Sequence, residues 1–140
     1  MKGEIFISDF NEEVNKTLVV EGDEHTIWAY VLNSLDGQNN IEFQGFLCSR
    51  GTLVEEESEI GDYIDQGFAP PLLRSFSNEY SVQEEITANN ISIFWDKEKV
   101  GVLVDEVTYL ILDYTNKVAY SKGVLEESPY GRPLMDFVME

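Results

Sequence analysis

ISIFWDKEKVGVLVDEVTYLILDYTNKVAYSK, residues 91–122, is the stretch from which the fold of this chain is predicted. It contains four short runs rich in β-branched and aromatic residues, a composition typical of β-strands: 91–95, 100–104, 107–112 and 118–121. Short polar segments separate the runs, and such connections join only antiparallel neighbours, because a parallel crossover needs about a dozen residues or more. The stretch therefore predicts a four-stranded antiparallel meander.

The third run of the meander has apolar side chains at both odd and even positions, among them Tyr109, Leu110 and Ile111. This pattern predicts a central strand that is covered on both faces. Asp105 and Glu106 mark the turn before it. They are a weaker turn signal than Asp-Gly, because a type I′ hairpin requires positive φ at both central residues.

Two further hairpins are predicted before the meander. The first pairs residues 4–8 with 17–21, and the second pairs 26–33 with 41–49 around a loop at Asp36-Gly37. Residues 26–33 are again apolar on both faces. Gly45 in the last of these strands indicates a bulge or a large side chain lying close to the backbone.

After Gly51 the apolar residues no longer alternate with polar ones but recur with the period of an α-helix. The apolar residues Leu53, Ile60, Tyr63 and Ile64 fall on one face, and Glu55, Glu59 and Asp62 fall on the opposite face. We therefore expect one amphipathic helix over about 53–66, ended near Gly67. The segment 69–90 is the least regular; a short helix from 82 to about 87 is expected there, and long loops often carry binding residues.

These elements together predict the α+β class, with mostly antiparallel sheet and one helix, in a single globular domain of residues 1–140. Strands with two apolar faces need cover on both sides. A partly closed barrel and a sandwich with the helix packed across it both satisfy this requirement, and the sequence leaves both open.

Charge is the extreme property of the chain: 27 acidic and 9 basic residues give a formal net charge of −18. Such a field repels nucleic acid phosphates and anionic lipids and attracts a basic protein or a cation. Acidity that serves only solubility is the alternative. No apolar run approaches the roughly 20 residues that span a bilayer, and the N-terminal residues lack a signal-peptide core, so we expect a cytoplasmic protein with no membrane partner.

The side chains most often used in catalysis are sparse. Cys48 is the only cysteine, which excludes an internal disulfide, and its place in a predicted strand indicates a small buried residue. His25 is the only histidine and follows Asp23-Glu24, but nothing supplies a second imidazole or a thiolate cluster, so a turn residue is favoured over a metal ligand. The sequence predicts no catalytic residue, metal site or cofactor.

Three classes of function fit these observations. The first is an acidic protein-binding module, such as an inhibitor or immunity-type protein that covers a basic partner, with Glu55, Glu59 and Asp62 steering the encounter and Tyr130 as an exposed aromatic anchor. The second is a small enzyme or hydrolase that uses two carboxylates as acid and base. The third is a subunit or ligand-binding module whose cavity is lined by tryptophans and tyrosines.

Overall fold

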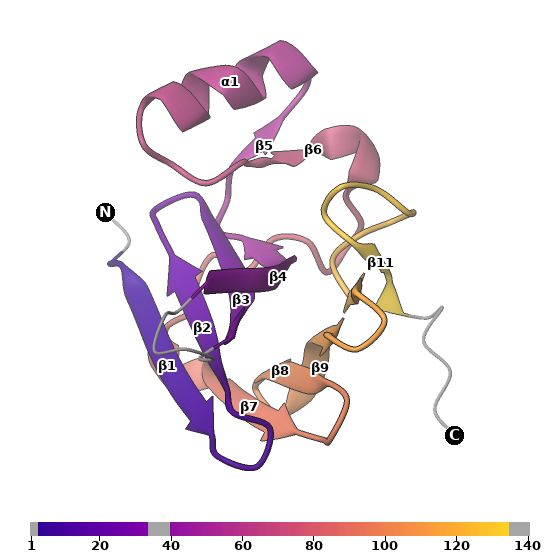
Figure 1. Ribbon diagram of the computed structural model, residues 1–140. Coiled ribbons are helices and arrows are strands. Elements are labelled where there is room, and N and C mark those ends of the chain that lie inside the picture. Colours follow the sequence, from indigo (N-terminus) through magenta and orange to yellow (C-terminus); the bar gives the residue numbers. More distant parts are fainter. Residues whose placement is uncertain (1–2, 34–39, 135–140) are drawn as a thin grey trace.

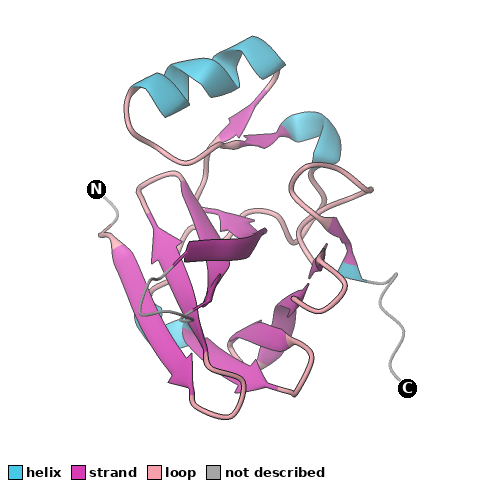
Figure 2. Cartoon of the chain, viewed as in Figure 1, coloured by secondary structure: helices cyan, strands magenta, loops and turns pink. Residues whose placement is uncertain are grey.

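The computed structural model describes residues 3–33 and 40–134 and consists of two main β-sheets and one α-helix (Figure 1). The strands are β1 (Ile5–Asn11), β2 (Lys16–Gly22), β3 (Thr26–Asn33), β4 (Asn40–Ser49), β5 (Leu53–Val54), β6 (Leu72–Leu73), β7 (Ile91–Trp95), β8 (Val100–Val104), β9 (Val107–Asp113), β10 (Val118–Ser121) and β11 (Arg132–Pro133). The helices are α1 (Glu57–Asp65) and the 3₁₀ turns η2 (Arg74–Phe76) and η3 (Ala88–Asn90). The chain has the predicted α+β class with mostly antiparallel strands (Figure 2).

The first four strands form the N-terminal sheet, in the order β1-β2-β3-β4, with every pair antiparallel. Both predicted N-terminal hairpins are therefore confirmed. Only the part of the predicted loop at Asp36-Gly37 that precedes Asn40 lies outside the described residues. In β3 the side chains alternate as predicted, because Ile27, Ala29 and Val31 face one core cluster and Trp28 belongs to another.

The predicted meander forms the C-terminal sheet, in the order β11-β10-β9-β8-β7. Strands β7 to β10 are antiparallel, and the two-residue β11 adds to β10 in parallel. Strand β9 is central, as predicted, but the expectation that both its faces are covered is wrong. Leu110 and Leu112 are fully buried on the inner face, whereas Ile111 on the outer face remains partly exposed.

The two sheets face one another across the main hydrophobic core. Leu18, Val20 and Val31 of the N-terminal sheet and Val100 and Leu112 of the C-terminal sheet are all fully buried in it. In the described part of the chain no strand pairing joins the two sheets, so the sheets pack as layers and the barrel alternative is wrong.

Gly45 on β4 lies directly against the facing C-terminal sheet. A Cβ atom at this position would stand 2.6 Å from Cδ2 of Leu112 and 3.0 Å from Cβ of Ala119, both on the facing sheet. The predicted large side chain close to the backbone is thus Leu112, and only glycine permits this approach.

A second, smaller core covers the outer face of β3 and β4. Trp28, Phe46 and Tyr130 pack there with ring centroids 5.4–5.8 Å apart, together with Leu72 and Val124. The irregular segment after α1 and the segment before β11 therefore serve as the cover of the N-terminal sheet.

The helix is shorter than predicted. Residues 53–54 form β5, paired in parallel with β6, and α1 begins at Glu57 because Glu56 and Glu59 form a capping box. Gly67 ends the helix as predicted: its φ is +94°, and the N–H groups of Gly67 and Phe68 donate to the carbonyls of Ile64 and Tyr63. The prediction of a short helix over 82–87 is wrong. The capping box in this region is formed by Thr87 and Asn90, and it starts η3.

No helix among the described residues is both long and apolar enough to cross a membrane.

Candidate functional site

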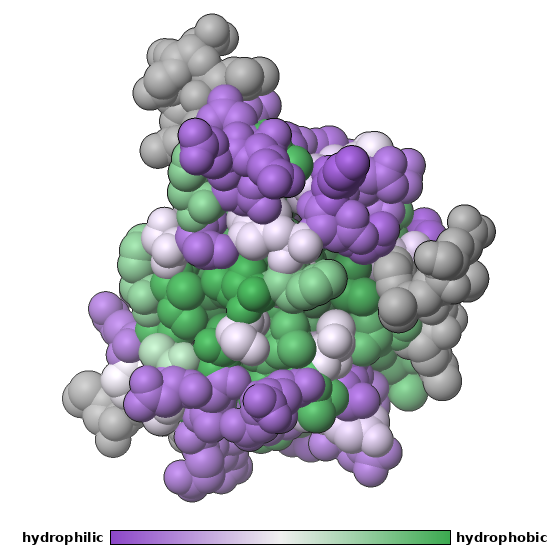
Figure 3. All heavy atoms as spheres, turned by 90° about the horizontal axis from the view of Figure 1, so that it is seen from below, coloured by the Kyte–Doolittle hydropathy of each residue, from purple (hydrophilic) through white to green (hydrophobic). Residues whose placement is uncertain are grey.

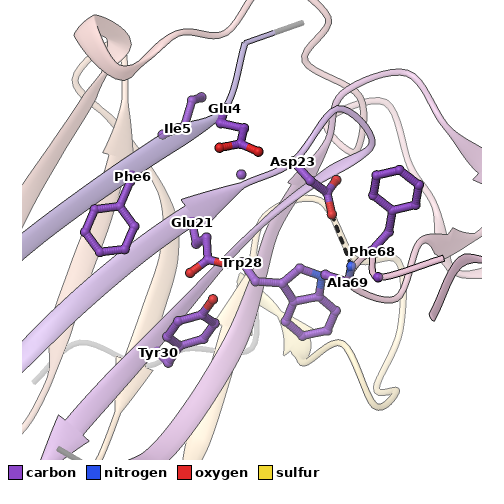
Figure 4. A pocket seen from close by; sticks show the side chains of 11 residues that line it. Glu4, Ile5, Phe6, Glu21, Asp23, Trp28, Tyr30, Phe68 and Ala69 are labelled. Carbon is purple, nitrogen blue, oxygen red and sulfur yellow. Dashed lines mark hydrogen bonds between the residues drawn. The ribbon is translucent and has the colours of Figure 1, made fainter. Parts of the chain in front are cut away.

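A pocket of about 410 Å³ lies beside the β2–β3 turn, between the N-terminal sheet and the segment that follows α1 (Figure 4). It is lined by Glu4, Ile5, Phe6, Glu21, Gly22, Asp23, Trp28, Tyr30, Gly67, Phe68 and Ala69. Three of these residues are acidic, four are aromatic and none is basic. We call it the acidic aromatic pocket.

The register of the N-terminal sheet brings the first group of these residues together. Glu21 on β2 is the cross-strand partner of both Phe6 on β1 and Trp28 on β3. Cross-strand partners point to the same face of a sheet, so a carboxylate stands between two aromatic rings. Tyr30 follows Trp28 on the same face of β3.

The Tyr30 hydroxyl and the Glu21 carboxylate lie side by side at one end of the pocket (Figure 4). Burial raises the pKa of the Tyr30 phenol, and its hydrogen bond to Glu21 and the charges of Glu21 and Asp23 raise it further. The phenol therefore stays protonated and donates to the Glu21 carboxylate, which faces the pocket as an acceptor.

At the other end of the pocket, the Asp23 carboxylate holds the backbone in place through hydrogen bonds. Its Oδ1 accepts from the backbone N–H groups of His25 and Thr26, at 2.7 and 2.9 Å, and its Oδ2 accepts from Ala69 N at 3.1 Å (Figure 4). This carboxylate fixes the β2–β3 turn against the segment after the helix. It keeps the pocket wall in place and adds negative charge to it.

Two of the four aromatic side chains of the pocket, Trp28 and Phe68, are fixed by contacts with neighbouring segments. Trp28 is buried and its Nε1–H donates to the carbonyl of Pro70 at 3.2 Å. Phe68 packs edge-on against the His25 ring with centroids 4.5 Å apart, and His25 also contacts Tyr63 of α1 at 5.0 Å and Thr52 Oγ1 at 2.8 Å. His25 is thus a turn residue, as favoured, and it joins the β2–β3 turn to the helix.

This combination of groups suits a cation. Carboxylates accept hydrogen bonds from ammonium and guanidinium groups, and aromatic faces attract the same cations through the ring quadrupole. An arginine fits best, because its planar guanidinium can stack on a ring while it donates to a carboxylate.

Negative charge is concentrated in the part of the chain that builds the pocket. Residues 1–90, which form the N-terminal sheet and α1, hold 18 acidic and 4 basic residues, whereas residues 91–140 hold 9 acidic and 5 basic residues. The two parts thus differ in net charge, −14 against −4. Most of the net negative charge of the molecule therefore belongs to residues 1–90.

The carboxylates predicted to steer a partner lie near α1 and outside the pocket. Glu55 pairs with Arg74 at 2.6 Å, and Glu59 Oε2 accepts from the backbone N–H groups of Glu55 and Glu56, at 2.7 and 3.0 Å. Asp62 is exposed on the helix. Glu59 therefore also caps α1, and the steering role of the three residues stays a prediction.

Tyr130 is not at the surface, so the expectation of an exposed aromatic there is wrong. It is only 4% exposed, and its hydroxyl donates to the carbonyl of Pro71 at 2.6 Å. The Pro-rich context indicated a turn, but the ring points inward and fills the second core between Trp28 and Phe76. It cannot reach a partner from this position.

Cys48 is fully buried in the main core, as predicted. Burial raises the pKa of its thiol to about 12, although the charge of Arg50 acts in the opposite direction. The thiol is therefore neutral and inert at ordinary pH. Within residues 3–33 and 40–134 no group of three or more His, Cys, Asp or Glu side chains is placed to hold a metal ion.

Comparison of the chain with protein families, with curated proteins and with solved structures finds no match in any of the three.

The third hypothesis named a cavity lined by tryptophans and tyrosines, but the sequence did not predict where the acidic aromatic pocket lies or that carboxylates line it. The signal for the pocket was present in β3, where Trp28 and Tyr30 alternate with small aliphatic residues and mark one face as aromatic. The position of Glu21 between Phe6 and Trp28 depends on strand register, and the approach of Phe68 depends on the tertiary packing of α1.

Proposed function

We propose that this chain is an acidic protein-binding module that docks a basic protein and receives an arginine or lysine side chain of that partner in the acidic aromatic pocket. An inhibitor or immunity-type protein that covers a basic target works in this way. The concentration of charge in the N-terminal sheet and α1 would speed the encounter, and the pocket would hold the anchor residue.

One observation carries the proposal: the most acidic part of the chain contains a pocket whose charged side chains are all carboxylates and whose lining includes four aromatic residues. A convex acidic surface alone would be compatible with mere solubility. A recess with Glu21 set between Phe6 and Trp28 has the shape and chemistry to select a cationic side chain.

The engagement of the carboxylates supports binding over carboxylate catalysis. Asp23 accepts three backbone N–H groups and Glu21 accepts the Tyr30 hydroxyl, so both are committed acceptors that hold a fixed position. Such preorganised acceptors are suited to recognising a donor-rich cation.

The test is an NMR titration with N-acetyl-arginine-methylamide as the probe, followed on the indole N–H of Trp28. Saturable shifts of this signal and of the amides of Glu21 and Phe68 are expected. The double variant Glu4→Gln/Glu21→Gln should weaken binding about tenfold, which corresponds to about 1.4 kcal/mol.

A matched control removes the same charge elsewhere. Glu12→Gln/Glu13→Gln alters two exposed carboxylates at the β1–β2 turn, outside the pocket. If both double variants weaken binding equally, the probe senses only net charge and the pocket is not the site.

A further inference from the structure

Strand β1 is the edge strand of the N-terminal sheet. It pairs with β2, and within residues 3–33 and 40–134 no backbone hydrogen bond outside that ladder involves residues 5–11, although the turn η3 lies nearby. Every second residue of an edge strand directs its N–H and C=O groups away from the sheet. The strand runs along the left side of the molecule in Figure 1. Its outward-directed backbone groups are therefore available to another strand.

Strand β1 lacks most of the features that keep edge strands from pairing. Its sequence, Ile-Phe-Ile-Ser-Asp-Phe-Asn, has no lysine and no proline, and its register with β2 runs without a bulge over all seven residues. Its one charged side chain, Asp9, accepts a hydrogen bond from the Trp95 indole at 2.7 Å. An unprotected edge of this length is a site at which an extended segment can add to the sheet.

The outer face of β1 is aromatic. Phe6 and Phe10 are 67% and 55% exposed, and Ser8 between them is exposed as well. These side chains point to the face opposite Ile5 and Ile7, which pack in or against the main core. Seen from below, a hydrophobic band crosses the molecule and extends to its left margin, the side on which β1 lies in Figure 1 (Figure 3). An added strand thus finds apolar contacts for its side chains on this face.

The start of β1 belongs to the acidic aromatic pocket. Glu4 and Phe6 line the pocket with Glu21 and Asp23, and no basic residue lines it. Phe6 is the cross-strand partner of Glu21 on β2. A residue paired with Phe6 from the free side of β1 would lie on the same face, with its Cβ about 4.5–5.5 Å from that of Phe6. Its side chain would therefore point toward the pocket.

Further negative charge lies beside this end of β1. The carbonyls of Gly3 and Ile86 both accept from the Arg50 guanidinium, so the segment before Ile86 lies close to the start of β1. This segment contributes the exposed carboxylates of Glu84 and Glu85. Arg50 itself is only 4% exposed. The start of β1 therefore favours a cationic side chain on an added strand.

The other end of β1 is mixed in charge. Lys16 at the start of β2 is paired with Glu42 at 2.7 Å. The β7–β8 turn follows Trp95, the partner of Asp9, and holds two lysines and two acidic residues: Asp96, Lys97, Glu98 and Lys99. An uncharged apolar side chain beside the exposed ring of Phe10 suits this end best.

We infer that the edge of β1 pairs with an extended segment of the basic partner and that this pairing delivers an arginine into the acidic aromatic pocket. The inference rests on the proposed function and adds the way in which the partner is held. Antiparallel pairing is slightly more stable per residue than parallel pairing. In that direction the arginine lies opposite Phe6, and an apolar residue four positions before it lies opposite Phe10. Backbone bonds along β1 give affinity, and the pocket gives specificity.

A second copy of the chain suits this edge poorly. Two β1 strands that pair antiparallel about Ser8 would place Glu4 of one copy opposite Glu12 of the other, and like charges directly opposite each other are destabilising. Each copy also carries a net charge of −18. A basic segment avoids both costs.

The experiment uses a synthetic peptide, acetylated and amidated, with the sequence Lys-Leu-Thr-Ser-Thr-Arg-Thr-Lys. Its leucine, serine and arginine are placed to lie opposite Phe10, Ser8 and Phe6. Amide hydrogen exchange of the full chain is followed by NMR with and without the peptide. Exchange of every second amide along β1 should slow when the peptide binds, because these amides gain a hydrogen-bond acceptor.

Two N-methylated peptides test the backbone bonds. One is methylated on the nitrogens of its leucine and serine, and the other on those of the two threonines beside the serine. Because neighbouring N–H groups of a strand point in opposite directions, only one of the two pairs faces β1. One methylated peptide should therefore bind about tenfold more weakly than the parent and the other about as well. Equal effects of the two methylations overturn the inference.

The variant Phe10→Ala tests the strand outside the pocket. It should weaken the binding of the peptide about fivefold, the loss of one cross-strand contact, and leave the binding of N-acetyl-arginine-methylamide unchanged. The control is Phe94→Ala, which removes a ring that is 64% exposed on the C-terminal sheet and should change neither. Circular dichroism of both variants checks the fold. If Phe94→Ala weakens the peptide as much as Phe10→Ala does, the peptide does not bind along β1 and the inference is overturned.

Failure of this inference can be told from failure of the proposed function. If the arginine probe binds in the pocket but the peptide protects no amides of β1 up to roughly 1 mM, only the strand pairing is wrong. If the arginine probe does not bind, the pocket proposal fails and this inference fails with it. Protection of alternate β1 amides in a dimer without peptide also overturns the inference, because a second copy then occupies the edge.

Discussion

Arg50 is a buried cation that is solvated by backbone carbonyls. It is 4% exposed, and its guanidinium donates to the carbonyls of Gly3, Asp23 and Ile86. These carbonyls belong to three separate segments: the residues before β1, the β2–β3 turn and the loop before η3. A single side chain thus joins parts of the chain that are far apart in sequence, and two of these parts border the acidic aromatic pocket.

We predict that Arg50→Met lowers the free energy of unfolding by about 2–4 kcal/mol. Methionine fills much of the same volume and carries no charge to bury, but three carbonyls lose their donor, and each unsatisfied buried group costs about 1–3 kcal/mol. Urea unfolding followed by circular dichroism measures the difference.

The control for Arg50 is Arg74→Met. Arg74 pairs with Glu55 in the open, with the two side chains 59% and 65% exposed, so its loss should cost less than about 1 kcal/mol. Equal losses for the two variants would mean that the carbonyl bonds of Arg50 contribute little beyond an ordinary surface charge.

At the scale of elements, the β8–β9 hairpin has an unfavourable turn sequence. Asp105 and Glu106 have φ of +50° and +70°, which is the type I′ pattern that favours Asn-Gly. The left-handed conformation costs an L-residue with a side chain roughly 1–2 kcal/mol. Asp105 is partly compensated, because its carboxylate accepts from Asn90 Nδ2 at 2.8 Å.

Glu106→Gly should therefore stabilise the protein by about 0.5–1 kcal/mol, the relief of strain less the entropy that glycine adds to the unfolded chain. Thermal unfolding should show a Tm higher by a few degrees. Glu98→Gly in the β7–β8 turn is the matched control: Glu98 is exposed but is not among the residues with positive φ, so this change should lower the Tm. If Glu106→Gly also lowers the Tm, the side chain of Glu106 stabilises the protein by more than its left-handed backbone conformation destabilises it.

The elements could be predicted where periodicity is local and strong. The four runs of 91–121 and both N-terminal hairpins followed from alternation and turn residues, and the helix end followed from Gly67. The helix start did not, because Leu53 fits the helical face as well as it fits a strand, and only the pairing of β5 with β6 decides between them. The same limit applies to Tyr130, whose burial depends on the distant rings of Trp28 and Phe46.

At the scale of the whole molecule, the pocket could not be predicted because it combines three separate segments. Glu4 precedes β1, Glu21 and Trp28 are partners on β2 and β3, and Phe68 follows α1. Composition leads only to the expectation of a cationic partner, because net charge is a sum over residues. It does not predict where carboxylates and aromatic rings meet, because that depends on register and on how the layers pack.

Glu42 joins the two sheets through charge. Its carboxylate on β4 accepts from Lys16 Nζ on β2 and from Lys117 Nζ in the β9–β10 turn, both at 2.7 Å. Burial raises the pKa of this carboxyl, but the hydrogen bonds and charges of Lys117 and Lys16 outweigh burial, and the net pKa is lowered. A carboxyl whose pKa is lower in the folded state stabilises the protein above its unfolded pKa, about 4.3, and this stabilisation is lost as the pH falls through the folded value.

We therefore predict that Glu42→Gln lowers the free energy of unfolding by about 1–2 kcal/mol at pH 7, where two charge-assisted bonds are weakened. The difference from wild type should shrink below about pH 4.3 and approach zero once Glu42 is protonated, because glutamine resembles the neutral acid. Urea unfolding of both proteins at a series of pH values measures this difference, and the comparison cancels the titration of the other 26 acidic side chains. A difference that stays constant from pH 7 to pH 3 would mean that Glu42 acts through packing alone. In that case the contact between the sheets at this corner depends on the hydrophobic core and not on the ion pairs.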